Sequence, residues 1–235
     1  MKDFAQFEKK IGIHFSNKDL LREAFTHRSY INESKRSDLT HNERLEFLGD
    51  AVLELIVTDY LFKKYLDKTE GDLTSYRSAL VNAVTLGEVA KNLGMNEYLL
   101  LSKGESKDIG KARQIILANT FESFVGALYM DQGYEKAELF IKTHLLPLTD
   151  TIVANELWRD AKSLFQEKAQ EGDGITPVYK VVRESGPDHD KKFTVAVYLD
   201  DELVAEADGK SKQEAEQGAA AVALEKKGWK TERES

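Results

Sequence analysis

The pattern best suited to chemistry is a pair of acidic side chains one helical turn apart. Glu46 and Asp50 are four residues apart, and Leu53 and Val57 continue the same side of a predicted helix. Two carboxylates therefore interrupt an apolar surface. Because neighbouring like charges repel when they are partly desolvated, such a pair is costly unless a cation lies between the two groups. A hard divalent cation such as Mg²⁺ would supply that charge.

A second cluster repeats this arrangement further along the chain. Asn119 and Glu122 place two oxygen-bearing side chains at positions i and i+3, and Gly126 follows on the same face. A glycine there allows another helix to approach closely. Two crossed helices could thus bring Glu46, Asp50, Asn119 and Glu122 together. The alternative is that both clusters are solvated faces of amphipathic helices, and spacing alone leaves the two possibilities open.

The elements that would carry these residues are helices. All three prolines lie beyond residue 146, and apolar residues three and four apart recur before that point. The pattern predicts helices over 20–25, 45–56 with a start near Thr40, 77–90 and 115–129. We expect an all-α domain over residues 1–150, followed by a joint over 149–156.

The periodicity changes after this joint. A helical pattern over 161–169 precedes three alternating, strand-like segments at 178–184, 193–199 and 202–207. Ser211 and Glu214 then form a capping-box pattern before a final helix, and Gly228 suits the end of that helix. The prediction is a small α+β domain over residues 157–228 with the order α-β-β-β-α.

Composition excludes several classes of site. The chain has no cysteine, which rules out disulfides, thiol nucleophiles and thiolate zinc sites. Its net charge of −8 means that any binding to nucleic acid must use a local basic patch. We expect no membrane segment and no small-molecule cofactor, and the absence of a secretory signal pattern makes the cytoplasm the expected location.

A longer motif connects these observations to a known family. The run from Glu43 to Leu53, ERLEFLGDAVL, resembles the signature of the ribonuclease III endonuclease domain. Supporting matches are the residues from Thr26 to Tyr30, from Glu70 to Leu73, and Phe121 with Glu122. The resemblance implies a homodimeric, Mg²⁺-dependent endonuclease that cuts double-stranded RNA to 5′-phosphate and 3′-hydroxyl ends. Structured RNA precursors such as ribosomal RNA are the implied substrates.

The resemblance also assigns a metal centre. Glu46, Asp50, Asn119 and Glu122 correspond to the metal-site residues, with Asp50 and Glu122 as the catalytic pair. The family generally has Asp where this chain has Asn119, and an amide oxygen can ligate a cation but brings no charge. A noncatalytic double-stranded RNA-binding protein with a disabled nuclease centre is therefore the alternative function. A third possibility, an acidic helical protein that binds another protein, leaves both sets of motifs unexplained.

Residues 158–228 resemble a double-stranded RNA-binding domain. Lys210 and Lys212 flank a helix start, where free backbone N–H groups already favour phosphate, so they are a candidate phosphate clamp. The resemblance places Gln166, Glu167 and His189 against successive RNA minor grooves. A surface loop remains an alternative role for His189.

The resemblance places Glu43 and Glu70 near the RNA as well. Each has a structural alternative, because Thr40 and Glu43 have capping-box spacing and Glu70 suits a solvated helix start. Phe47 matches a family position at the dimer contact, although a core aromatic is the simpler interpretation.

Overall fold

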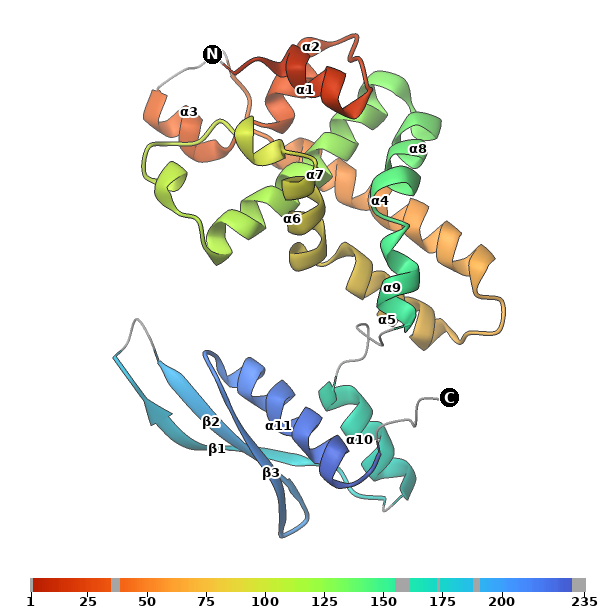
Figure 1. Ribbon diagram of the computed structural model, residues 1–235, viewed down its shortest axis with the longest axis vertical. Helices are drawn as coiled ribbons and strands as arrows, with labels where there is room; N and C mark the ends of the chain where they lie inside the picture. Colours follow the sequence, from red (N-terminus) through yellow and green to blue (C-terminus); the bar gives the residue numbers. More distant parts are fainter. Residues whose placement is uncertain (1, 35–38, 155–160, 173, 188–190, 230–235) are drawn as a thin grey trace. The chain divides into compact units, whose positions relative to one another are not determined.

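The computed structural model describes residues 2–34, 39–154, 161–172, 174–187 and 191–229. The chain divides into two compact units, residues 1–158 and 159–235 (Figure 1). Within the described residues, no helix is both long enough and apolar enough to span a membrane.

The first unit is helical. Its helices are α1 (Phe4–Ile11), α2 (Lys18–Ala24), α3 (Arg28–Ser34), α4 (Glu43–Lys64), α5 (Glu70–Val81), α6 (Ala83–Asn92), α7 (Lys111–Gln132), α8 (Tyr134–His144) and α9 (Leu148–Ala154), with two short 3₁₀ turns at Met95–Glu97 and Glu105–Lys107. Helix α7 is the centre of this unit, and α2, α4, α6 and α8 pack against it (Figure 1). Fully buried aromatic rings fill the space between these helices, including Phe7, Phe25 and Phe124.

Helices α4 and α7 cross with their backbones in direct contact. A Cβ atom placed on Gly49 would lie 1.8 Å from the carbonyl oxygen of Glu122, and one on Gly126 would lie 2.2 Å from that of Leu45. Real Cβ atoms do not approach another atom so closely, so only glycine fits at these two positions. The predicted close approach at Gly126 is confirmed.

The predicted helix over 77–90 is wrong as a single element, because Asn82 divides it into α5 and α6. The backbone of Asn82 is extended, with φ −74° and ψ 160°. Its side-chain oxygen accepts hydrogen bonds from the N–H groups of Val84 and Thr85, while its amide group donates to the last carbonyls of α5. One asparagine thus ends one helix and caps the next.

The capping box at Thr40 and Glu43 is also wrong. Helix α4 begins at Glu43 with Asn42 at its N-cap position, and Thr40 is exposed outside the helix. The carboxylate of Glu43 is instead 3.3 Å from the guanidinium of Arg28. Phe47 is not a core aromatic, because 82% of its surface is exposed.

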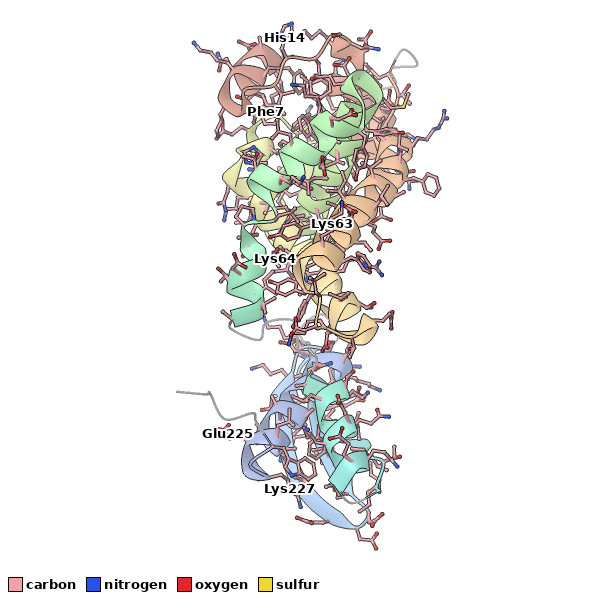
Figure 2. All side chains as sticks on the ribbon, turned by 90° about the vertical axis from the view of Figure 1, so that its right-hand side faces the viewer. Phe7, His14, Lys63, Lys64, Glu225 and Lys227 are labelled. Atoms are coloured by element: carbon pink, nitrogen blue, oxygen red, sulfur yellow. The ribbon has the colours of Figure 1, made fainter. Side chains whose placement is uncertain are left out.

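The predicted joint over 149–156 is helical as far as it is described. Helix α9 covers residues 148–154 and buries Thr149 and Ile152 against the first unit. Lys64 on α4, which is labelled in Figure 2, donates a hydrogen bond to the carboxylate of Asp150 on α9. These contacts make α9 part of the helical unit.

The second unit has the predicted order of elements. It contains α10 (Ala161–Gly172), β1 (Val178–Ser185), β2 (Lys192–Leu199), β3 (Glu202–Gly209) and α11 (Lys212–Lys226). The strands form an antiparallel sheet in the order β1-β2-β3, and side chains from both helices and the sheet share one core, including Phe165, Val197 and Ala219. The three predicted strands are confirmed, each to within two residues at its ends.

Both ends of α11 follow the sequence prediction. The hydroxyl of Ser211 accepts a hydrogen bond from the N–H of Glu214, as in a capping box. The carboxylate of Glu214 accepts from the N–H of Lys210, one residue earlier than the capping-box pattern predicts. Gly228 follows the helix with φ +68°, a left-handed conformation that favours glycine.

Candidate active site

The four predicted metal-site residues lie at the crossing of α4 and α7. Glu46 and Asp50 come from α4 on either side of Gly49, and Asn119 and Glu122 come from α7 just before Gly126. The side chain of Asn119 on α7 lies close enough to that of Glu46 on α4 to lower the pKa of Glu46. The backbone contact at the glycines is thus what brings the acidic side chains of two distant segments together.

Burial and mutual repulsion define the electrostatics of this crossing. Burial raises the pKa of Glu122 to about 7, and the negative charges of Asp50 and Glu46 add to this effect. Burial also raises the pKa of Glu46, as do the charges of Glu43 and Asp50, whereas the hydrogen bond to Asn119 acts in the opposite direction. A cation among these groups would relieve the repulsion.

The donor atoms fit a hard cation. Carboxylate and amide oxygens are the ligands that such ions prefer, and such an ion usually keeps several waters when it binds to few protein groups. In the part of the chain that the structure describes, no three Asp, Glu or His side chains are close enough together to hold a metal ion by themselves. The set at α4 and α7 therefore matches a hard divalent ion in the chemistry of its donor atoms.

The predicted RNA-contacting acids differ in their relation to this cluster. Glu43 begins α4, is exposed, and its charge reaches Glu46. Glu70 begins α5, is exposed, and accepts a hydrogen bond from the hydroxyl of Thr74 at 3.0 Å. The charge of Glu70 does not contribute to the pKa shifts of the cluster.

Arg28 lies beside the acidic start of α4, although helical spacing in the sequence gives it no role there. Its guanidinium is 3.3 Å from the carboxylate of Glu43 and holds it at the start of α4. The preceding residue is His27, whose Nδ1 atom shares a hydrogen bond with the hydroxyl of Ser29 at 2.8 Å. Burial lowers the pKa of His27. In the sequence, only the motif from Thr26 to Tyr30 indicates that Arg28 lies near the site, because no periodicity links these residues to α4.

The predicted RNA contacts in the second unit are exposed side chains. Gln166 and Glu167 are exposed on α10, and Lys210 and Lys212 are exposed on either side of the N-cap of α11. The ammonium of Lys212 lies 3.4 Å from the carboxylate of Glu184 and 5.6 Å from the centre of the Phe193 ring. His189 lies outside the described residues.

Comparisons with known proteins agree with both sets of motifs. The Ribonuclease-III-like family matches residues 17–148, and the double-stranded RNA binding motif matches residues 161–227. The chain belongs to the ribonuclease III family. Ribonuclease 3 of Bacillus velezensis is 42% identical over 227 residues, which cover 96% of this chain and 90% of that protein. Ribonuclease 3 of a Geobacillus species is 46% identical over 224 residues, or 95% and 90% of the two chains.

A solved structure supports the fold of the first unit. The nuclease domain of ribonuclease III from Campylobacter jejuni is 36% identical, with a TM-score of 0.55, over 63% of this chain and 97% of that one. The predicted fold class is confirmed, and the chain is a double-stranded RNA-specific endoribonuclease of a metal-dependent nuclease family. The noncatalytic alternative receives no support from these comparisons.

Proposed function

We propose that the chain is a Mg²⁺-dependent endonuclease that hydrolyses double-stranded RNA to 5′-phosphate and 3′-hydroxyl ends. The observation that supports this most directly is that the charges of Asp50 and Glu46 on α4 help to raise the pKa of Glu122 on α7. Glu46, Asp50, Asn119 and Glu122 would hold the ion. When bound, Mg²⁺ supplies an activated water and neutralises charge on the phosphate and the leaving oxygen.

The protein's own part in this reaction is positional. The side chain of Asn119 favours the charged form of Glu46, and the contact between Gly49 and Glu122 sets the separation of the two helices. Asp50 and Glu122 form the catalytic pair in this proposal, because they face each other across the two helices closely enough to interact.

Binding of the RNA is assigned to residues 157–228 together with two acids near the nuclease centre. Lys210 and Lys212 would clamp phosphates at the start of α11. Gln166, Glu167 and His189 would contact successive minor grooves, where 2′-hydroxyls identify RNA. Glu43 and Glu70 would lie near the scissile region. The proposed substrates are structured RNA precursors, such as ribosomal RNA.

We further propose that the active form is a homodimer, on the basis of exposed apolar groups along α4. Phe47, Leu55 and Phe62 are exposed on this helix, and Leu66 is exposed just after it. Phe47 also lies at the edge of a hollow of about 570 Å³, whose other lining residues include Leu20, Leu48 and Met130. Exposed apolar surface of this kind marks an interaction site, and a second copy offers the complementary ring and hollow.

A cleavage assay tests the nuclease function. Purified protein is incubated with long double-stranded RNA, with single-stranded RNA of equal length, and with Mg²⁺ or a chelator. We expect short fragments with 5′ phosphates only from double-stranded RNA in the presence of Mg²⁺. Double-stranded RNA that is retarded on a gel but stays intact with Mg²⁺ would contradict the proposal.

Analytical ultracentrifugation tests the dimer separately. Phe47→Asp should convert the protein to a monomer, because it replaces the apolar ring proposed to fill the hollow by a carboxylate that is costly to remove from water. Ile109→Asp is the matched control, since Ile109 is 91% exposed but lies outside α4. A Phe47→Asp protein that still sediments as a dimer would remove Phe47 from the interface.

A further inference from the structure

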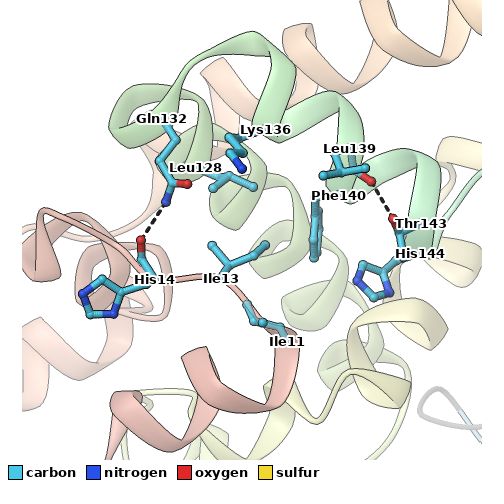
Figure 3. Close-up of a pocket in the computed structure, with 11 residues that line it drawn as sticks. Ile11, Ile13, His14, Leu128, Gln132, Lys136, Leu139, Phe140, Thr143 and His144 are labelled. Carbon is cyan, nitrogen blue, oxygen red and sulfur yellow. Dashed lines mark hydrogen bonds between the residues drawn. The ribbon is translucent and has the colours of Figure 1, made fainter.

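A second hollow lies in the helical unit, among residues that the nuclease proposal does not use. It measures about 330 Å³ and is formed by the chain just after α1, the end of α7, and α8. Its lining is Ile11, Gly12, Ile13, His14, Leu128, Gln132, Lys136, Leu139, Phe140, Thr143 and His144 (Figure 3). This volume is at the lower end of the range for small-molecule sites, about 300–1,000 Å³.

The charge of this hollow is opposite to that of the chain. Of the 235 residues of the protein, 41 are acidic, but none of the 11 lining residues is. Lys136 is exposed at the rim and forms no ion pair with any described residue. Figure 3 shows its ammonium group directed over Leu128 toward the interior. The hollow therefore offers an unpaired positive charge beside apolar side chains.

His144 provides a second polar group that has no partner. Its ring packs against that of Phe140, with centroids 4.8 Å apart, and burial lowers its pKa. Among the described residues, neither of its ring nitrogens has a hydrogen-bond partner. A neutral imidazole can donate one hydrogen bond and accept another, so His144 can bind a polar atom of a ligand.

The walls of the hollow are fixed before any ligand binds. The left-handed conformation of Gly12, with φ +70°, turns the chain after α1, and the N–H of Ile13 donates to the carbonyl of Glu8. The amide of Gln132 then donates to the carbonyl of His14 at 2.9 Å (Figure 3). Preformed walls reduce the ordering cost of binding.

We infer that this hollow is a binding site for a small organic carboxylate that carries one aromatic ring or branched chain. The ammonium of Lys136 would pair with the carboxylate. Ile13, Leu128 and Phe140 would cover the apolar part, and the size of the hollow limits that part to about one ring. The inference does not depend on the nuclease assignment, because none of these residues belongs to the proposed metal centre or RNA contacts.

The test compares 3-phenylpropanoate with its uncharged amide, two probes of nearly the same shape. Binding to the full-length protein is followed by NMR, through the backbone signals of 11–14 and 128–144 and the ring signals of His144. We expect the acid to shift these signals and to bind about fivefold more tightly than the amide, the size of one partly screened ion pair. Equal binding of acid and amide, or no binding of either, would overturn the proposal.

Substitutions on α8 test whether Lys136 is the residue that pairs with the carboxylate. Lys136→Met should reduce the affinity for the acid about fivefold and leave that for the amide unchanged. Lys142→Met on the same helix is the control, because Lys142 pairs with Glu138 at 2.8 Å and does not line the hollow. Thermal unfolding of both variants checks that the helical unit is intact. A folded Lys136→Met protein with unchanged affinity for the acid would exclude the proposed carboxylate position.

Discussion

The two units of the chain use charged side chains in opposite ways. In the helical unit, Glu46 and Glu122 are partly buried on packed helices, and burial with mutual repulsion raises their pKa values. In the second unit, the proposed contacts Lys210 and Lys212 are exposed beside a helix cap. The proposed chemistry therefore depends on the packing of the core, whereas the proposed RNA contacts are exposed groups that can be replaced without disturbing it. We therefore expect large losses from changes in the first unit and graded losses in the second.

The largest expected effect is that of Gly49→Ala. The new methyl group would lie 1.8 Å from the carbonyl oxygen of Glu122 and force α4 and α7 apart. We expect the free energy of unfolding to fall by about 3 kcal/mol or more, with loss of cleavage. Urea unfolding followed by circular dichroism measures this change. Gly71→Ala is the control, because its methyl group meets only the hydroxyl of Thr69 at 3.8 Å. Equal stability of the two variants would mean that the helices do not touch at Gly49.

The second effect concerns the carboxylates themselves. Glu122→Gln and Asp50→Asn each remove a charge with little change of volume, so cleavage should fall at least about a hundredfold while the fold and RNA binding persist. Single-turnover cleavage and gel retardation measure the two properties. Glu135→Gln on α8 is a control for loss of one exposed charge. Cleavage by Glu122→Gln at the rate of the control would exclude Glu122 as a catalytic residue.

The third effect concerns the exposed lysines of the second unit. Replacing Lys210 and Lys212 by Ala should weaken RNA binding and reduce the slope of log affinity against log salt concentration by about 1.8, or about 0.9 per phosphate contact. Cleavage at saturating RNA should persist. The control replaces Lys226 and Lys227, at the other end of α11, by Ala. An equal reduction of the slope in both double variants would show that net charge, not a clamp, controls binding.

The smallest effect is expected for Asn119→Asp. The substitution adds a negative charge beside Glu46, whose pKa the Asn119 side chain lowers. We expect half-maximal cleavage at a severalfold lower Mg²⁺ concentration, since attraction to the ion exceeds what remains of the repulsion once the ion is bound. A Mg²⁺ titration of both forms measures this shift. Identical curves would place residue 119 outside the coordination shell.

The two acidic faces could be predicted because helical spacing is regular, whereas spacing alone left open whether the two faces meet. Residues four apart must share a face, and Gly126 on the second face indicated the point of contact. The break at Asn82 could not be predicted in this way, because apolar spacing continues through it while the break depends on hydrogen bonds of one side chain. Spacing reports which face is apolar, but not where a cap interrupts it.

Two local predictions failed because the tertiary structure, not local spacing, decides where these side chains lie. Thr40 and Glu43 have the spacing of a capping box, yet Arg28, distant in sequence, binds the carboxylate of Glu43. Phe47 is apolar, but Leu45 and Gly49 on either side of it face the core and leave it exposed. In the first case a tertiary contact replaced the capping box that spacing predicts. In the second, the orientation of α4 left an apolar residue outside the core.

Helix α7 carries Asn119 and Glu122 and buries 11 of its residues between Ile116 and Leu128. Local opening of so deeply packed a helix requires that most of the unit unfold, so its amide hydrogens should be among the last to exchange with solvent. The four residues of the proposed catalytic centre thus all lie on the packed helices α4 and α7. On heating, activity should vanish together with the helical unit, with no temperature range in which a folded but inactive nuclease accumulates.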